Sequence, residues 1–175
     1  MARHKPHYGT CHICGVYDKL SFEHIPPEKA FNDKPILKAE FNSLIESDFG
    51  FNPIKGGRIQ QRGIGGYTLC ESCNVKTGGW YADDFVEWCY QGFLFLKRTE
   101  GKVSMKLPYH IFPLRVLKQI VTMFFSINGP SFRDQYPDLV KFVLDRERKY
   151  LNPRIRIYIF HNRNTTYRYC DKIST

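Results

Sequence analysis

Two Cys-x-x-Cys pairs constrain the fold of this chain more than any other feature of its sequence. Cys11 and Cys14 form the first pair, and Cys70 and Cys73 form the second, which begins 56 positions after Cys14. Each pair holds two thiolates within reach of one ion, and two such pairs close a tetrahedral Zn²⁺ site. Because four thiolates leave no open coordination position, we expect a structural zinc that takes no part in catalysis.

The other cysteines and the apolar segments indicate where such a chain works. Cys89 falls within a predicted helix and Cys170 ends the last predicted strand, so we expect both to be small apolar residues rather than ligands. No apolar segment follows the basic residues 1–6, which predicts the absence of a secretory signal. The longest apolar stretches, 92–96 and 120–127, are shorter than the roughly 20 residues that cross a bilayer. We therefore expect a cytoplasmic protein without membrane contact, whose paired cysteines bind metal rather than form disulfides.

Composition and periodicity predict a folded α+β chain. Of the 175 residues 42% are apolar, with 14 Phe and 11 Tyr, which is enough to bury a core and argues against wholesale disorder. Polar and apolar residues alternate at the start of 19–24, and Pro26-Pro27 ends this strand because proline cannot donate a ladder hydrogen bond. The other predicted elements are helices at 28–31, 80–97, 111–127 and 137–150, a strand at 154–160, a turn at 162–164 and a returning strand at 165–170.

The predicted elements divide near residue 100. Residues 1–100 contain the cysteine pairs and are expected to form a zinc-stapled core, and residues 101–175 are expected to pack on it as helices followed by a β-hairpin. A long connection from 28 to 66 includes a glycine-rich tract with Arg58 and Arg62. This tract is either a mobile loop that brings arginines and backbone amides to phosphates or an ordinary hairpin tip, and both interpretations stay open.

Net charge separates the same two parts. Residues 1–100 carry 12 Lys and Arg against 12 Asp and Glu, whereas residues 101–175 carry 14 against 5 and supply the whole formal charge of +9. This excess either binds a polyanion such as nucleic acid or keeps a surface solvated. In the first interpretation Arg154 and Arg156 share one face of a strand and follow a phosphate backbone. The candidate nucleic-acid-binding residues are Arg58, Arg62, Lys76, Arg146, Arg148, Lys149, Arg154 and Arg156.

Three polar residues beside the cysteine pairs are candidates for chemistry. Glu23 and His24 precede the two prolines, and Asn74 directly follows Cys73. A neutral imidazole can take a proton from an attacking water near physiological pH, which makes His24 a candidate general base. Carboxylate and amide oxygens suit Mg²⁺ or Mn²⁺, so Glu23 and Asn74 are candidate ligands of a catalytic metal. Neighbouring residues of a strand face opposite ways, so a site shared by Glu23 and His24 requires a local distortion at the prolines.

The order of these residues resembles the HNH, or ββα-metal (His-Me finger), endonucleases, most closely the branch typified by the phage recombination endonuclease VII. There a Cys-x-x-Cys pair is followed by an acidic residue and His, then by a second pair and Asn. The resemblance covers residues 11–90, and its most specific string is Leu69-Cys70-x-x-Cys73-Asn74-x-Lys76-Thr77. It implies a zinc-stabilised ββα-metal core with His24 as general base, Glu23 and Asn74 on the catalytic metal, and the four cysteines on zinc. The helix of that core would begin near Asn74 and continue past Gly78-Gly79.

The chain departs from this family pattern in two places. Many relatives have Asp where this chain has Glu23, whose extra methylene changes the reach of the carboxylate. The central Asn of the family usually lies shortly before the second cysteine pair, where this chain has only glycine, isoleucine and tyrosine at 63–67. That role is either unfilled or taken by Asn42, Asn52 or Arg62. The resemblance ends before residue 100.

These features predict a metal-dependent endonuclease that hydrolyses phosphodiester bonds in DNA, with structural Zn²⁺ and catalytic Mg²⁺ or Mn²⁺. The missing central Asn favours an alternative, a zinc-stabilised nucleic-acid-binding module without catalysis. A third interpretation is a protein-interaction domain with a basic face. Cleavage that depends on His24 distinguishes the first hypothesis from the other two.

Overall fold

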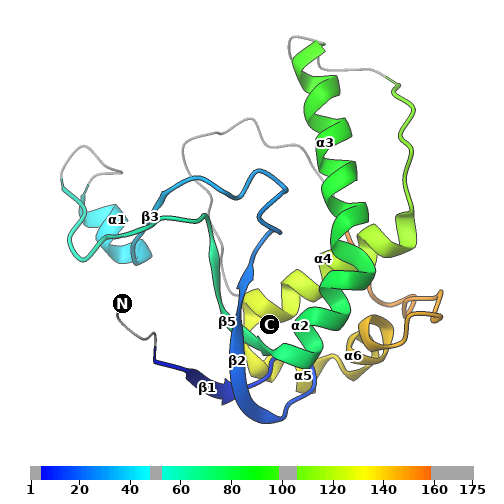
Figure 1. Cartoon of the computed structure of the whole chain (residues 1–175), viewed down its shortest axis with the longest axis horizontal. Helices are drawn as coiled ribbons and strands as arrows, with labels where there is room; N and C mark the ends of the chain where they lie inside the picture. Colours follow the sequence, from blue (N-terminus) through cyan, green and yellow to red (C-terminus); the bar gives the residue numbers. More distant parts are fainter. Residues whose placement is uncertain (1–4, 48–52, 99–105, 159–175) are drawn as a thin grey trace.

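A three-stranded antiparallel sheet brings both cysteine pairs to one of its ends. The computed structural model describes residues 5–47, 53–98 and 106–158 (Figure 1). The strands are β1 (His7–Thr10), β2 (Tyr17–His24) and β5 (Gly65–Cys70). Because β2 lies between the other two and runs antiparallel to both, the turn after β1 and the end of β5 lie side by side. The strand predicted at 19–24 is confirmed and begins two residues earlier.

The long connection between β2 and β5 contains a small hairpin-like unit of its own. Its elements are β3 (Ile36–Lys38), α1 (Phe41–Glu46) and β4 (Arg58–Gln60). β3 and β4 pair antiparallel as a separate two-stranded sheet, which lies to the left of the main sheet in Figure 1. The helix predicted at 28–31 is wrong, because these residues form only a hydrogen-bonded turn in which the Asn32 amide donates to the Glu28 carbonyl at 3.0 Å.

One continuous helical rod follows the second cysteine pair (Figure 1). It consists of α2 (Glu71–Thr77), a π-helical turn η1 (Gly78–Ala82) and α3 (Asp83–Arg98). Glu71 lies in the first turn of α2, where its charge complements the helix dipole. The predicted helix at 80–97 is therefore confirmed but begins earlier, and Gly92 does not interrupt it.

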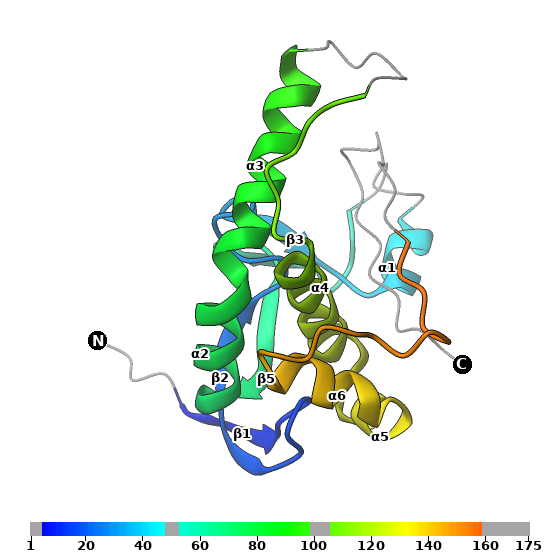
Figure 2. The same cartoon turned by 90° about the vertical axis from the view of Figure 1, so that its right-hand side faces the viewer.

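Three further helices follow residue 112 and lie beside the rod (Figure 2). They are α4 (Pro113–Asn128), α5 (Pro130–Gln135) and α6 (Pro137–Leu144). Periodicity predicted α4 and α6 but missed α5, which Pro130 begins directly after Gly129. α6 ends at Leu144 instead of residue 150, because the buried Lys118 ammonium donates to the carbonyls of Asp145 and Arg146 at 2.6 and 3.0 Å. None of the described helices is long and apolar enough to cross a membrane.

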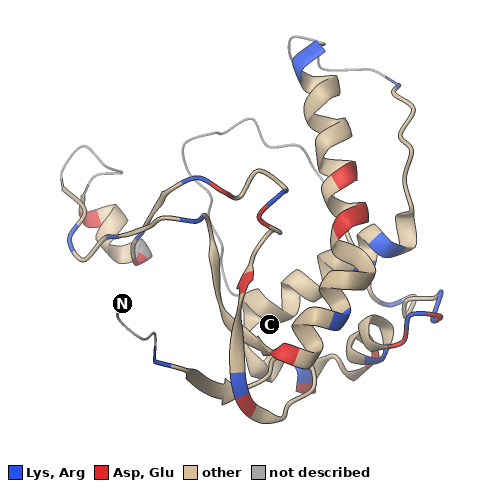
Figure 3. Cartoon of the chain, in the orientation of Figure 1, with Lys and Arg blue, Asp and Glu red and all other residues tan. Residues whose placement is uncertain are grey.

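The described segment after α6 is irregular, with turns at 146–147 and 153–154, and it is not a strand. Residues 154–158 form no ladder, so the predicted strand is wrong over its described part, and residues 159–170 of the predicted hairpin lie outside the described residues. Ile155 and Ile157 pack against the core, whereas Arg154 and Arg156 are exposed. An irregular segment in which alternate residues pack on the core thus shows the same period-two pattern as a strand. Acidic and basic residues are interleaved just after α6 (Figure 3).

The main apolar core joins the sheet to the helices that follow residue 112. Val121 and Phe125 of α4 are fully buried against residues of the sheet and the cysteine turn. The buried members of this cluster are Cys11, Ile13, Leu20, Leu69, Cys70, Cys73, Val121, Phe125, Phe132, Leu139, Phe142 and Val143. Burial of this kind stabilises a fold by roughly 25 cal/mol per Å² of apolar surface, so the two parts of the chain share one core.

Candidate functional site

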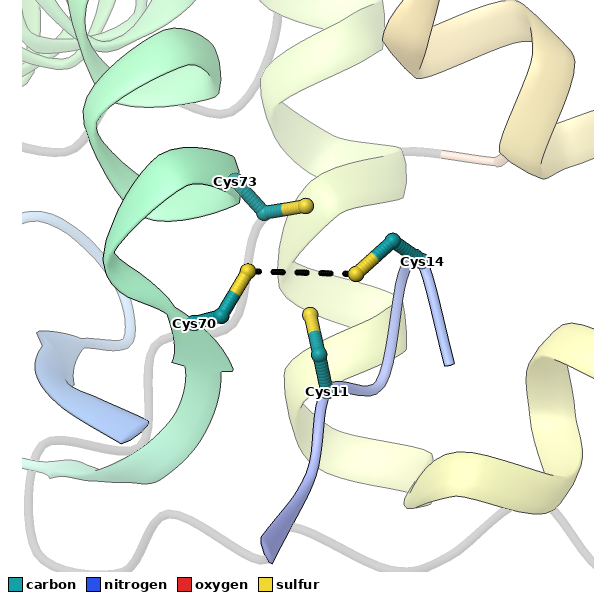
Figure 4. A group of neighbouring side chains, drawn as sticks. All are labelled: Cys11, Cys14, Cys70 and Cys73. Atoms are coloured by element: carbon teal, nitrogen blue, oxygen red, sulfur yellow. Dashed lines mark hydrogen bonds between the residues drawn. The ribbon is translucent and has the colours of Figure 1, made fainter. Parts of the chain in front are cut away.

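Four cysteine sulfurs converge at the end of the main sheet (Figure 4). Cys11 and Cys14 come from the turn between β1 and β2, and Cys70 and Cys73 come from the junction of β5 and α2. All four Sγ atoms lie within 4.8 Å of one another, and those of Cys14 and Cys70 are 3.8 Å apart. Tetrahedral Zn²⁺ with bonds near 2.3 Å requires sulfurs about 3.8 Å apart, whereas a disulfide requires about 2 Å. The group can hold a metal ion, and its geometry suits structural zinc.

Hydrogen bonding within the cluster favours a thiolate, the form of cysteine that binds metal. The pKa of Cys11 is lowered to about 4, chiefly by the hydrogen bond from the Cys73 thiol. The same contact raises the pKa of Cys73, while burial raises the pKa of Cys14. The partly buried Cys89 thiol packs among apolar residues of α3 and α4, where burial raises its pKa to about 11, and it lies outside the four-cysteine group. Cys170 lies outside the described residues.

Gly15 and Arg133 close the outer side of the first cysteine turn. The Gly15 amide donates to the Cys11 carbonyl at 2.9 Å, and Gly15 has a φ of 78°, which favours glycine. A methyl group on Gly15 would lie 1.0 Å from Nη1 of Arg133, which extends from α5. The cysteine turn is therefore covered by a helix from the second part of the chain.

A pocket of about 200 Å³ lies at the other end of β2. Its walls come from β2 and the loop after it, from the α2–η1 junction and from α4. The three residues that the sequence singled out for chemistry, Glu23, His24 and Asn74, all line it. The full lining is Phe22, Glu23, His24, Pro27, Glu28, Asn74, Thr77, Gly78, Ala82 and Gln119.

Glu23 is buried, with 8% of its surface exposed, and it joins β2 to α4. Its Oε2 accepts hydrogen bonds from Ser126 at 2.5 Å and from Thr68 at 3.2 Å. Oε1 has no partner among the described residues. Burial raises the pKa of Glu23 to about 7, because loss of water disfavours the charged carboxylate. One carboxylate oxygen is thus fixed by two hydroxyls, and the other is left to interact with a ligand.

His24 follows Glu23 but packs differently. Its ring makes an edge contact with the Phe22 ring, with centroids 5.0 Å apart. Its Nε2 is buried and has no hydrogen-bond partner. The chain is irregular on both sides of the pair, with a register shift between Ser21 and Phe22 and a cis peptide bond between Ile25 and Pro26. A buried imidazole nitrogen without a partner is a group to which a ligand or water can bind.

Asn74 lies on the first turns of α2, where its amide points back to β2. Nδ2 donates to Oγ of Ser21 at 3.0 Å and to the carbonyl of Phe22 at 3.3 Å. These bonds orient the side-chain amide and leave Oδ1 without a partner among the described residues. Asn74 is therefore a second pocket residue with a side-chain oxygen that has no partner among the described residues.

Asn32, which the sequence analysis missed, fixes the loop beside His24. Its Nδ2 donates to the carbonyls of Pro26 and Ile64, both at 2.7 Å, and its Oδ1 accepts from the Ile64 amide at 2.7 Å. Gly63 is needed here, since it has a φ of 64° and a methyl group on it would lie 1.9 Å from the Asn32 carbonyl oxygen. The glycine-rich tract thus contributes a tight contact and the start of β5.

Two of the residues considered for the central Asn role, Asn42 and Arg62, do not line the pocket. Asn42 is exposed on α1, Arg62 is exposed in the bend before β5, and Asn52 lies outside the described residues. Asn32 is far in the sequence from the second cysteine pair, where the family pattern predicts the central Asn. Its signal was a lone Asn in a turn that follows two prolines, which sequence alone does not separate from an ordinary turn residue.

α4 contributes one pocket residue, Gln119, and a hydroxyl bonded to Glu23, that of Ser126, which the sequence analysis also missed. Gln119 and Ser126 lie seven positions apart, on one side of a helix whose other buried residues are mostly apolar. Gln119 has 3% of its surface exposed, and its Oε1 has no partner. Polar residues in the buried face of an apolar helix were the available signal.

Four rings form a row from the pocket across the main sheet. His24 contacts Phe22, Phe22 contacts Tyr67 at 5.4 Å between centroids, and Tyr67 stacks on His7 at 3.7 Å. Phe22 and Tyr67 are each 37% exposed, and His7 is also exposed. We call His7, Tyr67, Phe22 and His24 the aromatic row.

The basic residues predicted to bind nucleic acid do not line the pocket. Arg58 and Arg62 lie on the connection before β5, and Lys76 is exposed on α2 near Asn74. The basic residues after α6 have acidic neighbours, and Arg148 lies 3.9 Å from the Asp138 carboxylate. The remaining members, Arg146, Lys149, Arg154 and Arg156, are exposed in the segment that follows α6.

Comparisons of the chain with protein-family models, with curated proteins and with solved structures found no match.

Proposed function

We propose that this protein is a metal-dependent endonuclease that hydrolyses phosphodiester bonds in DNA, with a ββα-metal core. The observation that carries the proposal is the convergence of Glu23, His24 and Asn74 on one pocket, beside a sheet whose far end holds a four-cysteine group. Positions 24 and 74 are distant in the chain, and the two cysteine pairs fix the strand and the helix that carry them. Chemistry and scaffold thus support the same assignment.

The free oxygens of the pocket suit a divalent cation. Mg²⁺ and Mn²⁺ prefer oxygen ligands, and Glu23 Oε1 and Asn74 Oδ1 are both without partners among the described residues. Glu23 and Asn74 would hold the cation. When bound, the cation stabilises negative charge on the phosphate and on the departing oxygen.

His24 supplies the general base of the proposed reaction. Its imidazole removes a proton from a water molecule, whose oxygen forms a bond to phosphorus while the bond from phosphorus to the departing sugar oxygen breaks. The departing oxygen takes a proton from solvent, so that a phosphate monoester and a hydroxyl are produced. The unpartnered Nε2 supports this role, because no group of the described residues binds it.

The surface beside the pocket supports nucleic acid as the partner. Exposed aromatic rings stack with bases, and the aromatic row ends at His24 in the pocket. Exposed arginines at 154 and 156 supply phosphate contacts that do not depend on base sequence. Stacking and phosphate binding together are typical of nucleic-acid-binding surfaces.

A second candidate, a zinc-stabilised nucleic-acid-binding module without catalysis, is favoured by the surroundings of Glu23. Two hydroxyls hold one of its oxygens, and its pKa of about 7 means that a large fraction is uncharged at neutral pH. A neutral carboxyl bonded to Ser126 is a stable structural contact that needs no cation. In this candidate the pocket has no catalytic role, and nucleic acid binds at the aromatic row alone.

Nicking of supercoiled plasmid separates the two candidates. Zinc-loaded protein is incubated with plasmid and Mg²⁺ or Mn²⁺, and in parallel with a chelator followed by added Zn²⁺ alone. The proposal expects nicks with Mg²⁺ or Mn²⁺ only, and it expects His24→Ala to abolish them. Binding without nicking under every metal condition would establish the second candidate.

A further inference from the structure

We propose that Gln119 of α4 is a third protein ligand for the divalent cation in the pocket. The inference rests on the proposed function in one respect, namely that this pocket holds a cation. It goes further by placing part of the cation site in a helix outside the segment that resembles a known nuclease family. The side-chain oxygen of Gln119 is the predicted donor.

The burial of Gln119 needs an explanation. Its side chain is almost wholly buried, it lines the pocket, and its Oε1 has no hydrogen-bond partner. A buried acceptor without a partner destabilises a protein because it has lost its bonds to water, whereas an apolar residue at the same position would not. The other buried polar side chains of α4 are bonded, Thr122 to the Lys118 carbonyl and Ser126 to Glu23. Gln119 is the exception, and a bound ligand satisfies it.

Three residues that each have a side-chain oxygen without a partner among the described residues thus line one pocket. They are Glu23 on β2, Asn74 on α2 and Gln119 on α4. Asn74 is oriented by its bonds to β2, and α4 is fixed to β2 through the bond between Ser126 and Glu23. Carboxylate and amide oxygens are the ligands that Mg²⁺ and Mn²⁺ take in proteins. A neutral third oxygen completes such a set without adding a second buried charge.

The test measures Mn²⁺ binding without nucleic acid. Zinc-loaded wild-type protein, Gln119→Met and Gln119→Glu are titrated with Mn²⁺, and free Mn²⁺ is followed by electron paramagnetic resonance. Methionine keeps the volume of glutamine and removes the oxygen, and glutamate keeps the oxygen. Thr122→Val is the matched control, since it removes a buried polar group from the same helix away from the pocket. Melting temperatures without Mn²⁺ verify that each variant is folded.

We expect Gln119→Met to weaken Mn²⁺ binding by about 10-fold or more, the size of effect that loss of a supporting group has on metal affinity. Its melting temperature without Mn²⁺ should equal or exceed that of wild type, because an unpartnered buried amide has been removed. Gln119→Glu should bind Mn²⁺ at least as tightly as wild type, and Thr122→Val should bind unchanged. Unchanged Mn²⁺ affinity in Gln119→Met overturns the inference, and so does a wild-type protein that binds no Mn²⁺.

The Mn²⁺-binding test of Gln119 and the nicking test of the proposed function can succeed or fail independently. If Gln119→Met loses Mn²⁺ affinity but wild-type protein never nicks DNA, the cation site stands and the nuclease assignment fails. If wild type nicks DNA in a His24-dependent manner while Gln119→Met binds Mn²⁺ normally, the nuclease assignment stands and Gln119 is not a ligand. An unfolded Gln119→Met leaves Gln119→Glu to decide, since weaker Mn²⁺ binding by that variant contradicts the inference.

Discussion

The four-cysteine group and the oxygen-lined pocket occupy opposite ends of β2 and are built on opposite principles. The cysteine group is closed, and all four of its ligands come from two short motifs. The pocket draws on β2, the α2–η1 junction and α4, and it leaves buried polar atoms on His24 and Gln119 without partners. One end is complete within a local sequence pattern, whereas the other depends on how distant segments pack.

This difference indicates how the fold divides its tasks. The two cysteine pairs join the start of β2 to the start of α2. The strand that carries Glu23 and His24 and the helix that carries Asn74 therefore keep the same relative position. α4 then covers the pocket and supplies hydroxyl and amide groups. A metal ion held by the four cysteines would stabilise one end of β2 and so permit polar groups without protein partners at the other end.

The largest effect is expected from the loss of a cysteine ligand, which tests the four-cysteine group. Cys73→Ser should unfold the domain, since structural zinc contributes on the order of 10 kcal/mol and a typical domain is stable by about 5–15 kcal/mol. Metal analysis of wild type should give one zinc per chain, and circular dichroism should show the loss of structure in the variant. Cys89→Ser, outside the group, is the control. A folded Cys73→Ser with unchanged melting temperature would contradict the zinc assignment.

Replacing His24 tests the proposed chemistry of the pocket. His24→Ala should keep the fold and the affinity for DNA but reduce single-turnover cleavage by roughly 10²–10⁴-fold, the usual contribution of a general base. The exposed His110 provides the control variant His110→Ala, which should cleave at the wild-type rate. Wild-type cleavage by His24→Ala would make His24 a packing residue.

The raised pKa of Glu23 predicts that the stability of the protein depends on pH. A carboxyl whose pKa is raised from 4.5 to about 7 on folding binds more protons in the folded state between these values. The free energy of unfolding should therefore fall as pH rises from about 4.5 to about 7, by at most about 3 kcal/mol, and then stay level. Urea unfolding of zinc-loaded protein without Mg²⁺ or Mn²⁺ measures this change.

The control for this pH dependence is a matched pair of variants. Glu23→Gln should remove the decline between pH 4.5 and 7, whereas Glu40→Gln, at an exposed position before α1, should retain it. Equal pH profiles for Glu23→Gln and wild type would show that Glu23 titrates normally. Added Mn²⁺ at pH 8 should stabilise wild type more than Glu23→Gln.

The aromatic row gives a smaller effect that concerns binding alone. Tyr67→Ala should weaken the affinity for single-stranded DNA by the equivalent of roughly 1–3 kcal/mol, since one base loses its stacking partner. Fluorescence anisotropy with labelled oligonucleotides measures it, with Tyr17→Ala as the control for an exposed tyrosine on the same sheet. Equal losses for the two variants would indicate that the row has no special role.

The basic segment after α6 gives the smallest expected effect per residue. Replacing Arg154 and Arg156 together with Ala should reduce the slope of log affinity against log salt by about two for duplex DNA, or about one per phosphate contact. Cleavage at saturating protein should stay near wild type. The exposed Lys29 and Lys38, replaced together with Ala, provide a control of equal charge. An unchanged slope would identify the charge of residues 154–156 as a solvated surface.

The sequence predicted the local features of this molecule well. Cysteine spacing predicted the four-sulfur group because both pairs are compact and their residue type is specific. Apolar periodicity predicted β2, α3 and α4 for the same reason. Three of the pocket residues could also be named in advance, because they lie next to the cysteine motifs or directly before the prolines.

The missed features all depend on contacts between distant residues. Asn32, Gln119 and Ser126 acquire their places only when α4 and the loop after β2 pack against the main sheet. α6 ends early because Lys118 of another helix binds the carbonyls that follow it, and residues 154–158 look like a strand because they lie amphipathically on helices. Neither cause can be recognised from the residues that are adjacent in the sequence.

The π-helical turn between α2 and α3 accommodates one extra residue within the helical rod. A π turn contains one residue more than an α-helical turn but still completes about one rotation, so the helices before and after it keep their rotational relation. Deleting Gly79 should therefore let the rod run as a plain α-helix in which Phe85 and Trp88 still face Val116 and Asn74 keeps its direction. A deletion within α3 would instead rotate every later side chain by about 100°, so the turn is the place in the rod where the loss of one residue should disturb packing least.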